Sequence, residues 1–200
     1  YADLLTPVER AYGEQFFQLS LPAQRFYVRL ALRKGPLFRS DKLQYSEIPD
    51  IASVAIELIE AGYLSQGENA SFDALLHLLV KPELSRFRAF ATADVSPLAD
   101  SSRETLVDNL LVNSNAAALR GFINFHIYEP LQLPTLRLFR LLFFGNLHQD
   151  FTEFVLNDLG ILPYEEYAIG QESRFFDRRE LLEQANTLAE LRDHAQMVIE

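Results

Sequence analysis

Basic side chains that could hold a polyanion gather near the start of this chain. The stretch from Ser20 to Lys42 contains Arg25, Arg29, Arg33, Lys34, Arg39 and Lys42. Its single acid is Asp41, so six basic residues against one acid give +5, although the whole chain carries −10. The local field decides where a polyanion binds, and the fork of an arginine matches the oxygens of a phosphate. The stretch is therefore a candidate phosphate-binding surface.

The spacing of these residues places part of the stretch on a helix. Arg25, Arg29 and Arg33 recur every four residues and so share one helix face. A weaker second group follows later in the chain, consisting of Lys81, Arg86, Arg88 and Arg103. Both groups also have an ordinary explanation, because charge runs are usually solvated surface and Glu83 and Glu104 lie close to the second group.

Residues for catalysis are missing from the chain. It contains no cysteine, no glycine-rich phosphate loop and no Gly-x-Ser-x-Gly turn. Its three lysines are each preceded, two residues earlier, by Leu or Ser, so the Asp/Glu-x-Lys motif of many metal-dependent nucleases is absent. His148, Asp150 and Glu153 have the spacing of a metal set, but acids in the first turn of a helix are the simpler explanation, and such spacings are common. We therefore predict no catalytic residue and no metal ligand.

Composition indicates a globular protein with a large core. Apolar residues make up 48% of the chain, with 16 Phe and 8 Tyr. No apolar run approaches the roughly 20 residues that span a bilayer, and the first ten residues lack the features of a signal peptide. We expect a cytoplasmic location without membrane contact. Because the chain begins at Tyr1 and reaches Glu200 inside a helical pattern, we also expect it to be part of a longer protein.

The first 70 residues are expected to form a helical, winged-helix-like module. Apolar spacing predicts a helix over 9–19 and another that starts at Ser20-Leu-Pro and stops at Gly35-Pro36. A third helix is predicted over 51–61, before Gly62. Three helices followed by a Gly-Tyr-Leu sequence are typical of such modules, although this ending is common elsewhere.

A SAP-like motif is predicted over residues 71–115. Helices are expected over 72–80, 82–90 and 103–112, with an irregular link between the last two. Residues 116–176 are then expected to form a helical connector with a short extended segment, and 177–200 a further helical region. The predicted fold class is thus mostly α.

Several sequence blocks, in this order, resemble the Fanconi-anaemia-associated nuclease family, whose members carry a VRR nuclease domain. The strongest is LPAQRFYVRLALRKGPLFRSDKLQYSEI, from Leu21 to Ile48. It is followed by IELIEAGYL and then by the SAP-like pair LLHLLVKPELSRF and RETLVDNLL. The last two blocks are LRLFRLLFFGNLHQDFTEFVLNDLGILPYEEY and FFDRRELLEQ. The resemblance covers nearly the whole chain and is closest to bacterial members.

The resemblance implies a structure-specific DNA nuclease that cuts near 5′ flaps, acts as a 5′ exonuclease and serves interstrand-crosslink repair. This chain would supply the DNA-binding N-terminal region, and 177–200 would begin a TPR-like helical region. The nuclease domain, of phosphodiesterase I type and dependent on Mg²⁺ or Mn²⁺, would lie outside it. By position, Arg29, Arg33, Lys34, Arg39 and Lys42 match the DNA-contacting surface of the family. Ser101 and Ser102 stand where many SAP motifs have glycine, so the SAP-like part departs from the usual pattern.

The expected partner is branched or flapped DNA, together with the helical and nuclease domains of the same protein. A nucleoid-associated location follows from this expectation, and a homodimer remains open. Two alternatives also remain open from the residues alone: a winged-helix DNA-binding regulator and a helical protein-interaction scaffold whose basic stretch binds an acidic partner.

Overall fold

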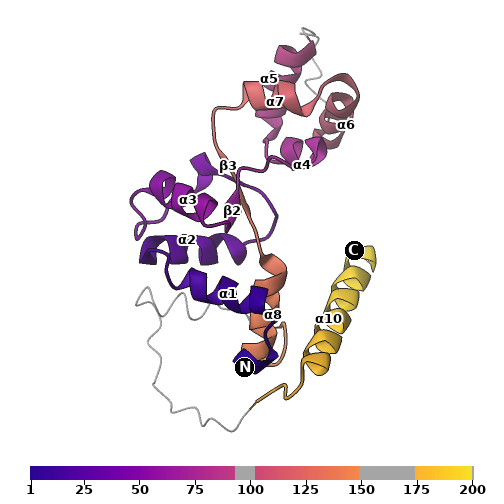
Figure 1. The fold of residues 1–200 in the computed structure, drawn as a ribbon. Helices are drawn as coiled ribbons and strands as arrows, with labels where there is room; N and C mark the ends of the chain where they lie inside the picture. The colour runs from indigo at the N-terminus through magenta and orange to yellow at the C-terminus, as the bar shows by residue number, and fades with distance from the viewer. Residues whose placement is uncertain (93–101, 149–173, 200) are drawn as a thin grey trace. The chain divides into compact units, whose positions relative to one another are not determined.

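A computed structural model of the chain describes residues 1–92, 102–148 and 174–199. The described residues are mostly helical, which confirms the predicted fold class (Figure 1). They divide into two compact units, one formed by Tyr1–Arg33 with Gln132–Glu200 and the other by Lys34–Leu131. No helix among these residues is both long enough and apolar enough to cross a membrane.

The first unit consists of helices from the two ends of the chain. They are η1 (Ala2–Leu4), α1 (Pro7–Phe16), α2 (Leu21–Ala31), α8 (Leu133–Phe144) and α10 (Arg179–Ile199). Local sequence signals fix where two of them begin. Thr6 and Glu9 form a reciprocal capping box at the start of α1, and the Ser20 side chain accepts a hydrogen bond from the backbone N–H of Ala23 in α2.

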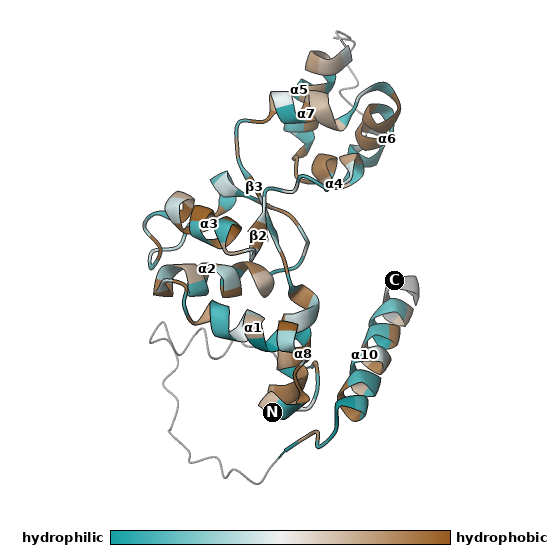
Figure 2. Cartoon of the chain, viewed as in Figure 1, coloured by the Kyte–Doolittle hydropathy of each residue, from teal (hydrophilic) through white to brown (hydrophobic). Residues whose placement is uncertain are grey.

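Aromatic side chains join α1 to its neighbours within this unit. The Tyr12 hydroxyl donates to the Tyr27 hydroxyl at 2.9 Å, and the Tyr12 ring lies 5.8 Å from that of Phe139 in α8. A second core includes Leu4, Leu138, Leu141, Leu142, Phe176 and Leu182. Figure 2 shows many hydrophobic residues along α8 and mostly hydrophilic residues along α10. The two ends of the chain are therefore packed in one unit.

The second unit is built on a small antiparallel sheet. Its elements are β1 (Phe38–Arg39), η2 (Ser40–Lys42), α3 (Ile51–Glu60), β2 (Leu64–Ser65), α4 (Phe72–His77), α5 (Lys81–Thr92), α6 (Arg103–Asn113), α7 (Ala116–Phe122) and β3 (Ile127–Pro130). The strand order is β1-β3-β2, with Phe38 opposite Tyr128 and Leu64 opposite Pro130. Helices α4 to α7 follow β2 in the chain and precede β3.

Helices α4 to α7 share a hydrophobic core with parts of the sheet. Its buried residues are Leu37, Leu75, Leu76, Leu79, Leu84, Phe87, Leu106, Val107, Leu110, Leu119 and Ile127. The glycine at 67 closes the turn before α4 with a φ of +66°, and a Cβ there would lie 3.0 Å from Ile127. Helices α4 to α7 thus form an insertion between β2 and β3 of the same sheet.

Several predicted boundaries differ from the observed ones. The helix predicted over 72–80 ends at His77, and the next extends to Thr92. The stretch 116–134, for which the sequence gives no clear periodicity, forms α7 and β3. The link over 93–101, and the predicted helix and extended segment over 149–173, lie outside the described residues.

Candidate nucleic-acid interface

The basic row of the first unit lies on α2. Buried Phe26 and Leu30 occupy one side of this helix. Arg25 and Arg29 are half-buried, and Arg33 is exposed just after the helix ends. The spacing of four residues therefore gives the shared face that the sequence predicts, and contact of this face with a phosphate stays a prediction.

Four basic side chains of the second unit are exposed to solvent. Lys34 precedes β1, Lys42 ends η2, and Lys81 and Arg86 lie on α5. The side chain of Lys42 is 66% exposed and its Nζ lies 4.0 Å from a carboxylate oxygen of Asp41. These residues present ammonium and guanidinium groups that could meet a polyanion without first losing a buried contact.

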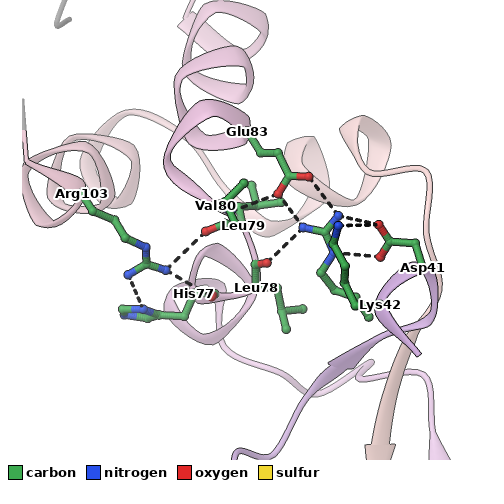
Figure 3. Close-up of polar contacts among 9 residues, drawn as sticks. Asp41, Lys42, His77, Leu78, Leu79, Val80, Glu83 and Arg103 are labelled. Atoms are coloured by element: carbon green, nitrogen blue, oxygen red, sulfur yellow. Dashed lines mark hydrogen bonds and ion pairs between the residues drawn. The ribbon is translucent and has the colours of Figure 1, made fainter. Parts of the chain in front are cut away.

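Arg39 has a different environment, because its side chain is only 8% exposed. All five of its N–H donors are bonded inside the protein (Figure 3). Its Nε and Nη2 donate to the carboxylate of Asp41 at 2.9 and 2.8 Å. Its Nη1 and Nη2 donate to Glu83 at 2.5 and 2.9 Å, and Nη1 also donates to the carbonyl of Leu78 at 3.2 Å. The guanidinium lies 4.0 Å from the ring centre of Phe125.

The electrostatics of this cluster favour its charged form. Hydrogen bonds from Arg39 hold the pKa of Glu83 and the pKa of Asp41 below their ordinary values. The same bonds raise the pKa of Arg39, most strongly through Glu83. A phosphate would have to displace one of these carboxylates to reach the guanidinium. In this conformation, every N–H donor of Arg39 is already bonded within the protein.

Arg103 and Arg88 are also engaged with the protein. Nη2 of Arg103 donates to the carbonyls of His77 and Leu79 at 3.1 and 3.4 Å, and its Nη1 lies 3.1 Å from Nδ1 of His77 (Figure 3). Arg88 is 7% exposed. Arg103 and Arg39 thus bind neighbouring carbonyls at the end of α4, which the helix leaves without partners.

The sequence missed the partners that separate Arg39 from its exposed neighbours. Asp41 was visible as the one acid in a basic stretch, and Glu83 as an acid at the third position of a helix. Neither position shows that both acids bind one arginine 44 residues away from Glu83. Within the described residues, no group of three or more His, Cys, Asp or Glu is placed to hold a metal ion.

Comparison with known proteins gives a consistent result. Residues 1–65 match the family model described as FAN1, HTH domain. The chain is 35% identical to a Fanconi-associated nuclease 1 homologue of Pseudomonas aeruginosa over 179 residues, which are 90% of this chain and 32% of that protein. A homologue of the same name in Arabidopsis thaliana is 31% identical over 214 residues, covering 96% of this chain and 23% of that protein.

Solved structures agree with the sequence matches. A crystal structure of paFAN1 bound to 5′ flap DNA with a 2-nt flap and a gap matches 98% of this chain with a TM-score of 0.81 and 32% identity. The sequence and structure matches thus agree that the chain is similar to a part of Fanconi-associated nuclease 1 proteins. A second structure of paFAN1, with a 1-nt flap, matches with a TM-score of 0.80. The chain spans about a third of the length of these bacterial relatives, 32% of one and 36% of the other.

Proposed function

We propose that this chain is the DNA-binding N-terminal region of a structure-specific 5′-flap endonuclease and 5′ exonuclease that acts in interstrand-crosslink repair. One observation carries the proposal: 98% of the chain matches, at 32% identity, a protein that was crystallised with 5′ flap DNA. A likeness of this extent at this identity supports a common way of holding the substrate.

The exposed basic residues, together with the half-buried arginines of the α2 row, are the proposed contacts with DNA. Lys34, Lys42, Lys81 and Arg86 supply them in the second unit, and the α2 row supplies them in the first. Contacts of lysine and arginine to phosphates position a protein on DNA without reading sequence. We therefore propose selection by the shape of the flapped DNA, with no sequence preference.

The phosphodiesterase chemistry is proposed for the remainder of the protein. Mg²⁺ or Mn²⁺ would bind there and stabilise charge at the phosphate that is cut. The described residues of this chain would hold the flapped substrate and contact the helical and nuclease domains. We also propose that the whole protein acts at the nucleoid in a bacterial cytoplasm. It would do so as a monomer or a homodimer.

A winged-helix regulator is a weaker candidate. The helix α3, which stands where such a module carries its DNA-reading helix, has Glu57 and Glu60 and is capped by Asp50. An acidic helix is a poor match for the phosphates that line a major groove. The other alternative is a helical scaffold whose basic stretch binds an acidic protein. A direct measurement of DNA binding distinguishes this alternative from the proposed function.

The test is the affinity of the protein for a 5′-flap DNA across a salt series. If each of the seven proposed residues contacts one phosphate, the slope of log K against log salt is about −6.3. Arg29→Ala/Arg33→Ala/Lys34→Ala should make the slope shallower by about 2.7 while the circular dichroism spectrum is unchanged. A matched control is Arg174→Ala/Arg178→Ala/Arg192→Ala, which removes the same charge elsewhere and should leave the slope near that of the wild type. Absence of binding at low salt would overturn the proposal.

A further inference from the structure

Arg39 is the point at which three segments of the second unit meet. It lies on β1 and reaches Asp41 in η2, Leu78 and Glu83 around the start of α5, and Phe125 before β3. The backbone continues this connection, because the N–H of Ser40 donates to the carbonyl of His126 at 2.9 Å. One buried guanidinium thus links the sheet to the turn between α4 and α5, in addition to the shared hydrophobic core.

The two carboxylates that bind Arg39 each have an exposed lysine close by in the chain. Lys42 directly follows Asp41, and Lys81 stands two residues before Glu83 at the start of α5 (Figure 3 draws both carboxylates and Lys42). Glu83 also accepts a hydrogen bond from the N–H of Val80 at 3.0 Å, which fixes the turn that leads into Lys81. The position of each lysine backbone is therefore tied to the same guanidinium.

Arg103 braces this turn from the other side. It binds the carbonyls of His77 and Leu79, while Arg39 binds the carbonyl of Leu78 between them. The turn between α4 and α5 consequently has a fixed conformation at the place where Lys81 leaves it. A lysine on a fixed backbone loses less conformational freedom on binding than one on a mobile loop.

We propose that Arg39 is a positioning residue for DNA binding. By holding Asp41 and Glu83 in one ion-pair cluster, it sets the separation of Lys42 and Lys81, so that their ammonium groups bind phosphates of one DNA substrate together. The inference rests on the proposed function, since it presupposes that the protein binds flapped DNA. It assigns Arg39 a role that does not require contact with a phosphate.

Removing an acid of the cluster distinguishes two explanations, positioning of the lysines and simple electrostatic attraction, because they predict opposite changes in DNA affinity. Glu83→Gln and Asp41→Asn each remove a negative charge, and attraction alone predicts tighter binding to DNA. Positioning predicts weaker binding, by about threefold to tenfold, with a slope shallower by about 0.9 to 1.8 because one or two phosphate contacts are lost. Asp108→Asn is the matched control, because this exposed acid lies on α6 of the same unit outside the cluster. It should leave affinity unchanged or increase it slightly.

A charge-conserving substitution gives an independent measurement. Arg39→Lys keeps the net charge but loses the planar fork that binds two carboxylates at once. We expect Arg39→Lys to weaken binding to flap DNA to the same degree as Glu83→Gln. In the Arg39→Lys background, Lys42→Ala should cause almost no further loss of affinity. If Arg39→Lys does not fold, as judged by thermal unfolding, the effect of Lys42→Ala in the Glu83→Gln background replaces it.

The outcomes distinguish this inference from the proposed function. If the wild type binds flap DNA and Glu83→Gln binds as tightly as Asp108→Asn or more tightly, Arg39 does not position the lysines and only this inference is overturned. If the wild type fails to bind at low salt, the proposed function is overturned and the inference with it. Weaker binding by Glu83→Gln and Arg39→Lys, with their folds retained, supports both.

Discussion

In each compact unit, an arginine among the described residues binds two carboxylates and a backbone carbonyl. In the second unit Arg39 binds Glu83 in a bidentate manner, together with Asp41 and the carbonyl of Leu78. In the first unit Arg179 binds both oxygens of Glu9, at 2.6 and 2.9 Å, together with Glu183 and the carbonyl of Leu4. The sets of hydrogen bonds are nearly the same, and their surroundings differ.

Burial separates the two clusters. The side chain of Arg39 is 8% exposed, whereas that of Arg179 is 27% exposed and its partner Glu183 is 58% exposed. Water that reaches an ion pair screens it and can replace a lost partner, whereas a buried charge without its partner is strongly unfavourable. We therefore expect the exposure of the arginine and of its surroundings, and not the number of hydrogen bonds, to set the free-energy cost of losing the arginine.

The largest effect is expected from Arg39→Met. This change leaves Glu83 half-buried without its cation, and we expect the free energy of unfolding to fall by about 3 kcal/mol. Amide hydrogen exchange of α4, α5 and β1 in the wild type and the variant would locate the loss in the second unit. A loss below about 1 kcal/mol would show that burial does not distinguish the two clusters.

Arg179→Met should have a smaller effect. Glu9 is 15% exposed and loses its bidentate partner, but Glu183 and the vacated space are accessible to water. We expect a fall of about 1 to 2 kcal/mol in the free energy of unfolding. The same exchange experiment should show faster exchange in α1 and α10 and no change in α4 and α5. Equal losses for the two methionine variants would remove the distinction drawn from exposure.

Acid should reduce the stability that both clusters contribute, because protonation of their carboxylates removes the ion pairs. Arg39 lowers the pKa of Glu83 and Arg179 lowers the pKa of Glu9, each from an ordinary value of 4.5. A carboxylate with a lowered folded-state pKa stabilises the protein fully above its unfolded-state pKa, and this contribution is lost as pH falls through the folded-state value.

The difference in free energy of unfolding between the wild type and Arg39→Met should therefore be constant near neutral pH and shrink below about pH 4.5. Denaturant unfolding at a series of pH values measures it. Arg179→Met should show the same trend with a smaller amplitude. A difference that grows as pH falls would contradict the assignment of the ion pairs.

How far the sequence predicted these features depends on the distance over which their causes act. Helix starts were predictable because Ser20, Ser71 and Ser102 each accept a hydrogen bond from an N–H three residues later. The strand β3 was not predicted, because its four residues pair with strands more than 60 residues earlier. Short local signals define elements, and long-range pairing decides which of them form a sheet.

The same reasoning explains the candidate site. Sequence grouped Arg39 with Lys42 because both are basic and lie in one stretch, and the structure exposes Lys42 but encloses Arg39. What encloses Arg39 is Glu83, which is 44 residues away, and the ring of Phe125. A charge pattern therefore identified the basic region, while tertiary contacts decide which of its members face solvent.

The smallest effect is expected from Arg174→Ala. Arg174 binds both oxygens of Asp3, at 3.0 and 2.8 Å, and this bond lowers the pKa of Asp3 to about 2. The pKa alone would suggest a strong pair, yet the side chains are 46% and 56% exposed, so water screens the attraction and solvates both charges once they separate. We therefore expect the Tm of Arg174→Ala to equal that of the wild type, beside a clear decrease for Arg179→Met. A decrease as large as that of Arg179→Met would mean that the bidentate geometry matters more than exposure, and would reverse the interpretation of both buried and exposed clusters.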